Sequence, residues 1–250
     1  MGDFLWAKQL SGESNEIGYS IVTDVYGNVY TNGFFSGTVD FDPGTGTYNL
    51  TSAGENDVFI SKLDASGNFL WAKQLGGLYE DYAFSVSTDI YGNVYTTGKF
   101  WGIADFNPGS GTYTLTSAGE YDIFISKLNS AGNFVWAKQI GGLNSDNANS
   151  SAVDSYGNVY TTGYFWGIVD FDPGSGTYNL TATNSADVFI SKLDASGNFE
   201  WAKQIGGVAY DISNCITTDA SGYVYTTGSF SDTVDFDPGS GITNLSSAGD

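Results

Sequence analysis

The sequence lacks the residue types on which many catalytic and redox sites depend. It contains no histidine and no arginine, and its single cysteine is Cys215. A histidine-based triad, a histidine-ligated metal and an arginine clamp are therefore excluded from this chain, and one cysteine gives no disulfide framework. Glycoside hydrolysis by two carboxylates remains, but the acids recur almost identically along the chain, whereas a catalytic pair needs differentiated environments. We predict that the protein is not an enzyme.

Positive charge and long apolar runs are also scarce. Eight lysines stand against 28 acidic residues, and the resulting net charge of −20 would repel a phosphate backbone. Nucleic acid is therefore not an expected partner. No apolar run approaches the roughly 20 residues of a membrane helix, so we expect no membrane insertion. The first residues, MGDFLWAKQL, have no basic region followed by an apolar core, so no signal peptide is predicted in this chain.

The chain does contain one motif repeated at a fixed spacing. Trp6, Trp71, Trp136 and Trp201 follow one another at intervals of 65 residues. A fixed period of this length indicates an array of supersecondary units. Abundant glycine (34 residues) and aromatic residues (16%), with no long helix-forming stretch, indicate an all-β class. We expect a single domain or propeller segment over residues 1–250, with repeats at approximately 2–66, 67–131, 132–196 and 197–250.

Each repeat offers four strand candidates, which are clearest in the second repeat at residues 83–89, 94–100, 122–128 and 134–140. Glycine and asparagine occupy the short linkers, where tight hairpins need positive φ. Small residues in the first strand fit a place where several strands converge on an axis; they are Ser20, Ser85, Ser150 and Cys215. Four-stranded antiparallel units repeated head to tail are typical of a β-propeller, with the first strand innermost.

The repeated pattern D-x-Y-G-N-V-Y-T-T-G…D-V-F-I-S-K-L-D-A-S-G-N-F-x-W-A-K-Q resembles the bacterial SBBP β-propeller repeat family. More distantly, it is similar to the tryptophan-docked blades of quinoprotein-type propellers. The resemblance covers essentially the whole chain, and it implies that Trp6, Trp71, Trp136 and Trp201 wedge adjacent blades together. It also implies an extracellular or cell-surface location. We expect Trp71, Trp136 and Trp201 to be largely buried at blade boundaries.

The segment between the second and third strands is too long for a simple turn, and it predicts an extra hairpin on the rim of each blade. Each copy carries two oxygen-bearing side chains two positions apart. The four copies are Asp40 with Asp42, Asp105 with Asn107, Asp170 with Asp172, and Asp235 with Asp237. This spacing resembles the start of a calcium loop, which makes calcium a candidate cofactor. A glycine stands where such a loop needs its next acid, so Asp-Pro-Gly turn chemistry is the alternative.

A second acidic set precedes each first strand and consists of Glu16, Asp81, Asp146 and Asp211. If the first strands line an axis, these carboxylates would meet at one mouth of the channel as a candidate cation or polar-ligand site. The alternative is that each caps the entry to its strand or accepts a hydrogen bond from the preceding Gly-Gly turn.

The expected function is that of a non-enzymatic, secreted or cell-surface scaffold or interaction module. A multivalent carbohydrate-binding lectin is the alternative, in which Trp101 and Trp166 stack on sugar faces. Ser36 and Ser231 stand at the equivalent positions of the other repeats, and an indole here could equally pack on its own hairpin.

The period also exposes an incomplete last repeat. Four full repeats of 65 residues would exceed the 250 residues present. The chain starts with a fourth-strand pattern at residues 3–10 and stops before the third strand of the last repeat. We therefore expect a segment of a longer propeller or array, in which the outer edge of residues 224–230 has no regular antiparallel partner. Such an edge invites strand exchange between chains.

Overall fold

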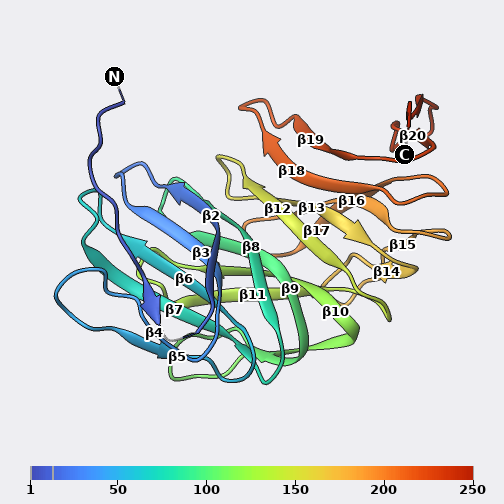
Figure 1. Ribbon diagram of the computed structural model, residues 1–250. Coiled ribbons are helices and arrows are strands. Elements are labelled where there is room, and N and C mark those ends of the chain that lie inside the picture. Colours follow the sequence, from blue (N-terminus) through green and yellow to red (C-terminus); the bar gives the residue numbers. More distant parts are fainter. Residues whose placement is uncertain (1, 13, 250) are drawn as a thin grey trace.

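The computed structural model describes residues 2–12 and 14–249 and confirms the all-β class (Figure 1). No described residue is helical, and all strand pairings are antiparallel. Among the described residues there is accordingly no helix that could cross a membrane.

Three successive units each contain four strands that pair in chain order. The first unit is β2 (Glu16–Thr23), β3 (Val29–Phe35), β6 (Asp57–Leu63) and β7 (Phe69–Gly77). The second is β8 (Asp81–Thr88), β9 (Val94–Asp105), β10 (Thr114–Leu128) and β11 (Phe134–Ile140). The third is β12 (Asn147–Val153), β13 (Val159–Phe165), β16 (Asp187–Leu193) and β17 (Phe199–Ile205). A fourth unit contains only β18 (Ile212–Thr218) and β19 (Val224–Ser229).

The expected extra hairpin follows the second strand of every unit. It consists of β4 (Thr38–Asp40) with β5 (Asn49–Thr51), β14 (Ile168–Asp170) with β15 (Asn179–Thr181), and β20 (Thr233–Asp235) with β21 (Asn244–Ser246). In the second unit, β9 and β10 themselves continue through the hairpin. A phenylalanine of each hairpin packs into the unit it follows. The rings of Phe35 and Phe41 lie 5.3 Å apart, and those of Phe41 and Phe59 lie 5.1 Å apart.

The end of each fourth strand crosses to the hairpin of the following unit. Gly76 and Gly77 of β7 pair with Asp105 and Ala104 of β9. The same crossing recurs as bridges between Gly141 and Asp170 and between Gly206 and Asp235. At the start of the chain, β1 (Ser11–Gly12) pairs in this way with β4. Neighbouring units are therefore joined by backbone pairing at their rims.

The first strands β2, β8, β12 and β18 lie beside one another in chain order. A β-bulge precedes the small residue of each first strand, and a bulge re-aims the side chain that follows it. As a result, Ser85 Oγ accepts a hydrogen bond of 3.0 Å from the backbone N–H of Ser151 in the next unit. Ser20 and Ser150 accept equivalent bonds of 3.2 Å. These serines therefore join the first strands laterally, where backbone ladders do not.

The two ends of the chain correct one sequence prediction and confirm another. Residues 3–10 form no strand, although they carry the fourth-strand pattern, because a fourth strand pairs with a third strand and the described chain has none for them. As predicted, β19 pairs with β18 alone among the described strands. The described strands form three complete four-stranded units and one two-stranded unit, and they do not close into a ring. The two ends of the chain lie on opposite sides of the arc in Figure 1.

We predict that Ser85→Val destabilises the protein because it leaves the amide of Ser151 without its acceptor in a buried position. The expected loss in the free energy of unfolding is about 1–3 kcal/mol, measured by urea denaturation. Cys215→Val is the matched control, because Cys215 holds the equivalent position but is exposed. Equal losses in the two variants would contradict this role for the serine.

Candidate functional site

Three of the repeated tryptophans, Trp6, Trp71 and Trp136, contact a turn of the unit that follows them in the chain. The indole Nε1 of Trp71 donates a hydrogen bond of 3.2 Å to the carbonyl of Ser130, and Trp6 and Trp136 make the same bond to Ala65 and Ala195. Beneath the Trp71 ring lies Gly132 (φ +76°), where an added Cβ would stand 3.1 Å from a ring atom. Glycine is therefore required at this turn by both its positive φ and the closeness of the ring.

The predicted burial of these tryptophans holds only in part. Trp136 is 8% exposed, whereas Trp6, Trp71 and Trp201 are half-buried. Each of the three complete units adds a tyrosine to the contact, edge-on to the indole at about 6 Å, in the pairs Tyr30–Trp71, Tyr95–Trp136 and Tyr160–Trp201. The tryptophans thus bridge units along a partly solvated seam.

Two lysines strengthen the same seam, and the sequence analysis missed them. Lys62 Nζ donates a hydrogen bond of 3.1 Å to the Ser130 carbonyl and lies 4.8 Å from the ring centre of Tyr30. Lys127 repeats this arrangement with Ala195 and Tyr95. Burial lowers the pKa of both lysines. Their sequence signal was a charged residue at a fixed period within a mostly apolar strand.

The acids before each first strand accept hydrogen bonds from the preceding turn, which is Gly-Gly for the three aspartates and Ser11–Gly12 for Glu16, in agreement with the alternative interpretation. Gly77 N–H donates to Asp81 Oδ2 at 2.8 Å, and Trp101 N–H donates to Asp81 Oδ1 at 3.4 Å. Equivalent bonds from the turn reach the other three acids, namely Glu16, Asp146 and Asp211. The three aspartates are buried rather than open to a channel mouth. In the described residues, no group of three or more Asp, Glu, Cys or His side chains gathers to hold a metal.

Each of these aspartates lies near a second buried carboxyl from the preceding unit. The pairs are Asp57 with Asp81, Asp122 with Asp146, and Asp187 with Asp211. A Cβ on Gly76 would stand 2.7 Å from Asp57 Cγ and 2.8 Å from Asp81 Oδ2, so glycine makes room between the two carboxyls. The Oδ1 atoms of Asp57, Asp122 and Asp187 have no hydrogen-bond partner among the described residues. Nothing in the sequence indicated this pairing, because it depends on how one unit packs against the next.

Burial favours the neutral form of these carboxyls. Burial, followed by the negative charge of Asp57, raises the pKa of Asp81 to about 8. Burial and the charge of Asp122 likewise raise the pKa of Asp146 to about 7. The pKa values of Asp122 and Asp187 rise to about 6, mainly through burial. Each boundary therefore favours a pair that holds at least one proton in mildly acidic solution.

We predict that the protein loses stability as the pH rises from about 5 to about 8. The folded-state pKa of Asp81, Asp122, Asp146 and Asp187 is raised, so the folded state binds protons that the unfolded state has released. Their contribution to the stability of the folded state is complete below the unfolded pKa of 3.8, and it is lost as the pH rises through their pKa values in the folded state. Denaturant unfolding at a series of pH values measures this slope. Asp81→Asn is expected to flatten it, whereas the exposed Glu55→Gln is the control; an unchanged slope in Asp81→Asn would contradict the assignment.

The Asp-Pro-Gly segments form self-contained turns. Asp40 Oδ1 accepts hydrogen bonds from the backbone N–H of Asp42 (3.0 Å) and Tyr48 (2.8 Å). Asp42 Oδ1 accepts one from Gly44 N–H at 2.8 Å. The same pattern holds in the second and third copies, at Asp105 with Asn107 and at Asp170 with Asp172.

The fourth copy repeats this geometry. Asp237 N–H donates a hydrogen bond of 3.0 Å to Asp235 Oδ1, and Asp237 Oδ1 accepts one of 2.8 Å from Gly239 N–H. Asp235 Oδ1 also accepts from Thr243 N–H at 2.8 Å, and these backbone bonds lower the pKa of Asp235. One oxygen of every such side chain is thus committed to its own turn.

These hydrogen bonds are the ones that the turn interpretation predicts, and calcium binding at these side chains stays a prediction. Each pair meets backbone amides of its own turn, and no third acid joins a pair to complete a metal-holding group anywhere in residues 2–12 and 14–249. The candidate metal ligands that accept these turn hydrogen bonds are Asp40, Asp42, Asp105, Asn107, Asp170, Asp172, Asp235 and Asp237.

We predict that millimolar calcium does not raise the melting temperature, because one oxygen of each candidate ligand is already hydrogen-bonded to its own turn. A cation that binds the folded state selectively would raise it. Thermal unfolding with and without calcium is the measurement, with magnesium as the control. A rise with calcium alone would contradict the prediction and support a calcium loop.

A groove on the rim lies between the hairpins of the first and second units, and another lies between those of the second and third units. The groove between the first two units has a volume of about 320 Å³, and its walls include Tyr48, Lys73 and Asn107. The groove between the second and third units has a volume of about 310 Å³, and its walls include Lys138 and Asp172. The repeat thus presents the same kind of surface at successive positions along the rim.

Trp101 and Trp166 both lie beside tyrosines. Trp101 is 40% exposed, and its ring centre is 4.9 Å from that of Tyr79 at a tilt of 32°. Trp166 is half-buried and lies 5.8 Å from Tyr210. The two tryptophans therefore form separate aromatic clusters.

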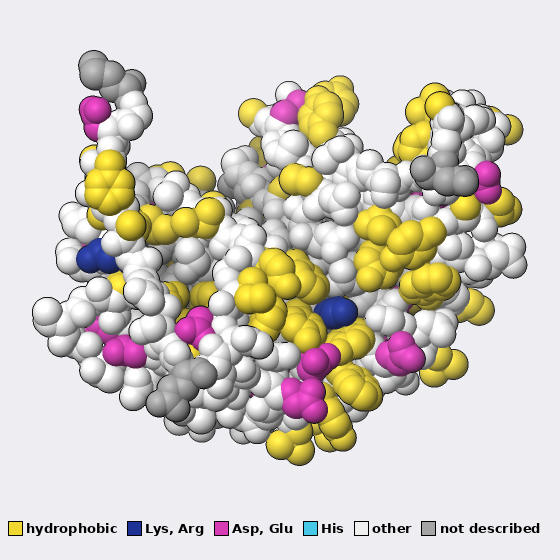
Figure 2. Space-filling model, viewed as in Figure 1, with side chains coloured by type: hydrophobic (Ala, Val, Ile, Leu, Met, Phe, Trp, Pro, Cys, Tyr) yellow, Lys and Arg dark blue, Asp and Glu magenta, His cyan; other side chains and the backbone are white. Residues whose placement is uncertain are grey.

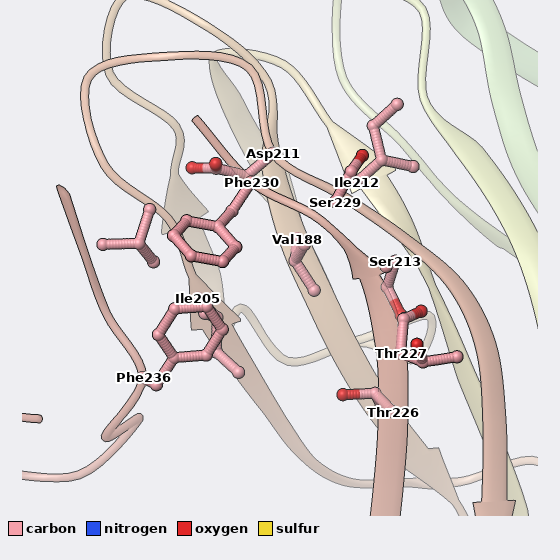
Figure 3. A pocket seen from close by; sticks show the side chains of 12 residues that line it. Val188, Ile205, Asp211, Ile212, Ser213, Thr226, Thr227, Ser229, Phe230 and Phe236 are labelled. Carbon is pink, nitrogen blue, oxygen red and sulfur yellow. The ribbon is translucent and has the colours of Figure 1, made fainter. Parts of the chain in front are cut away.

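A third hollow lies at the open side of the fourth unit. It has a volume of about 120 Å³, and Phe230 and Phe236 face it together with Val188 and Ile205 (Figure 3). It differs from the rim grooves because it exposes the apolar interior of a unit.

Comparison with known proteins finds similarity over parts of the chain. The SBBP β-propeller repeat family matches residues 70–107, 135–167 and 200–229. An uncharacterised WD repeat-containing protein, L264 of Acanthamoeba polyphaga mimivirus, is 28% identical over 236 residues, which are 84% of this chain and 17% of that protein. The regulatory protein FlaEY of Caulobacter vibrioides is 29% identical over 110 residues, which are 44% of this chain and 12% of that protein. The chain therefore matches less than a fifth of the length of either relative.

Proposed function

Because the chain carries SBBP β-propeller repeats at three positions, we propose that it is a non-enzymatic scaffold or interaction module. The observation that carries this proposal is the recurrence of one rim groove between successive units, about 320 and 310 Å³ in volume. A repeated surface on a rigid array suits the binding of an extended partner or of several copies of one partner. Similarity to a WD repeat-containing protein supports the same class of role.

Electrostatics favours a partner with basic or neutral contact groups. The net charge of −20 repels acidic partners and steers basic ones toward the surface. A secreted or cell-surface location is part of the proposal and rests on the family resemblance.

Photo-crosslinking tests whether the grooves are the contact surface. A photoreactive residue in place of Asn107 or Asp172 is expected to capture the same partner, because these positions line equivalent grooves. The control position is Tyr26, which is 74% exposed. A partner captured equally well from all three positions would contradict the proposed surface.

Carbohydrate binding is the second candidate, and the cluster around Trp101 favours it. Lys99 Nζ lies 4.1 Å from the ring centre of Tyr121 and 5.4 Å from that of Tyr82. Tyr121 also donates a hydrogen bond to the carboxylate of Glu80. Figure 2 shows hydrophobic side chains gathered around one lysine over β9. Exposed rings beside charged groups suit a ligand with apolar faces and hydroxyl groups.

A glycan array distinguishes the two candidates. The lectin function predicts binding to a defined set of sugars that is lost in Trp101→Ser or Trp166→Ser. Serine occupies the equivalent positions Ser36 and Ser231, so these substitutions are compatible with the repeat. The scaffold function predicts no sugar preference. Unchanged sugar binding in both variants would exclude the tryptophans as the sugar-binding surface.

A further inference from the structure

The outer edge of β19 has no partner among the described strands, although the equivalent edge in each of the other three units is paired with a third strand. Its equivalents β3, β9 and β13 each pair on both sides, with the first strand on one side and the third strand on the other. Among the described strands, β19 has only β18. The exposure of one tyrosine shows the difference, because Tyr225 is 55% exposed whereas Tyr30, Tyr95 and Tyr160 at the same position are 0–3% exposed.

The cavity beside this edge, lined by Phe230 and Phe236, lies where the other units place a phenylalanine of the third strand. In the complete units, the third strand contributes a phenylalanine that packs on the hairpin phenylalanine. The ring centres are 5.1 Å apart for Phe41–Phe59, 4.9 Å for Phe106–Phe124 and 5.2 Å for Phe171–Phe189. In the fourth unit, Phe230 and Phe236 lie 5.0 Å apart and line the cavity of about 120 Å³ (Figure 3).

A polar side chain of β19 also stands where its equivalents in other units donate a hydrogen bond to the third strand. Thr97 and Thr162 each donate a side-chain hydrogen bond, of 2.8 and 2.7 Å, to the carbonyl of the third-strand phenylalanine. Thr227 holds the same position and lines the cavity. The register of β13 with β16, in which Val159 faces Leu193 and Phe165 faces Asp187, transfers directly to β19.

From these observations we infer that the β19 edge and its cavity form an acceptor site for an extended segment of the sequence D-V-F-I-S-K-L, bound antiparallel. In the bound segment, phenylalanine fills the cavity, its carbonyl accepts from Thr227, and the first and last residues face Phe230 and Val224. Strand addition of this kind derives affinity from the backbone ladder and specificity from side-chain pockets.

The occupant is a segment supplied from outside the described units. The three segments of this type are β6, β10 and β16, and each already pairs on both sides within its own unit. Residues 3–10 do not qualify, because they carry the fourth-strand pattern and Trp6 is bonded to Ala65. A second copy of the chain in the same fold therefore offers no free third strand.

A fluorescently labelled heptapeptide with the sequence of Asp187–Leu193 tests this site on the full 250-residue chain. We expect saturable binding in fluorescence anisotropy and slower hydrogen exchange at the backbone amides of β19. Serine in place of the peptide's phenylalanine should weaken binding about tenfold or more, because the cavity is then left unfilled. This control leaves the protein unchanged, so it does not depend on whether a variant folds.

A protein variant supplies the complementary control. Phe236→Ala should weaken binding of the parent peptide, whereas Tyr26→Ala, at an exposed turn, should not. Absence of saturable binding, or equal binding of the parent and serine peptides, would overturn the inference. Self-association of the chain in sedimentation velocity that excess peptide does not reverse would also overturn it, because a second copy would then occupy the edge.

Discussion

The hydrogen bond from the indole of one repeat to the backbone turn of the next is the contact around which the array is built. It places Trp71 over Gly132 in the next unit and brings Lys62 to the same carbonyl, that of Ser130. Because a four-stranded unit is too small to bury all of its apolar surface, the seam between units completes the core. Stability in such an array is a sum of unit and boundary contributions, and here the boundary includes an aromatic contact, a lysine and a serine bond.

The sequence was sufficient for the elements that local patterns dictate. The period located the units, the glycine and asparagine linkers located the hairpins, and the long segment after the second strand became the extra hairpin. The strand predicted at residues 3–10 does not form, because a strand depends on a pairing partner as well as on its own sequence pattern. Residues 3–10 keep the fourth-strand sequence pattern, but the described residues contain no third strand that pairs with them.

The candidate sites were harder to predict, because the role of each residue depends on contacts between units. The small residue at Ser85 was expected to allow close approach, but its hydroxyl is an acceptor for the next first strand. For Asp81 a channel-mouth position and a hydrogen bond from the preceding turn were both open, and Asp81 accepts the turn bond while it lies buried beside Asp57 of the preceding unit. A one-dimensional pattern shows that such residues recur, whereas only the packing of units shows which residues face one another.

The contacts between units join residues at constant separations along the chain. The indole bond spans 59 residues, the serine bond spans 66 and the lysine bond spans 68, whichever pair of complete units is considered. Gain or loss of a whole 65-residue repeat leaves every such separation intact, whereas one inserted residue within a strand shifts the register of that strand and changes every separation that spans it. A gene for such a chain can therefore lengthen or shorten by recombination between its own repeats. An insertion at the tip of a rim hairpin leaves the register of the strand ladders unchanged, because the tip lies outside them.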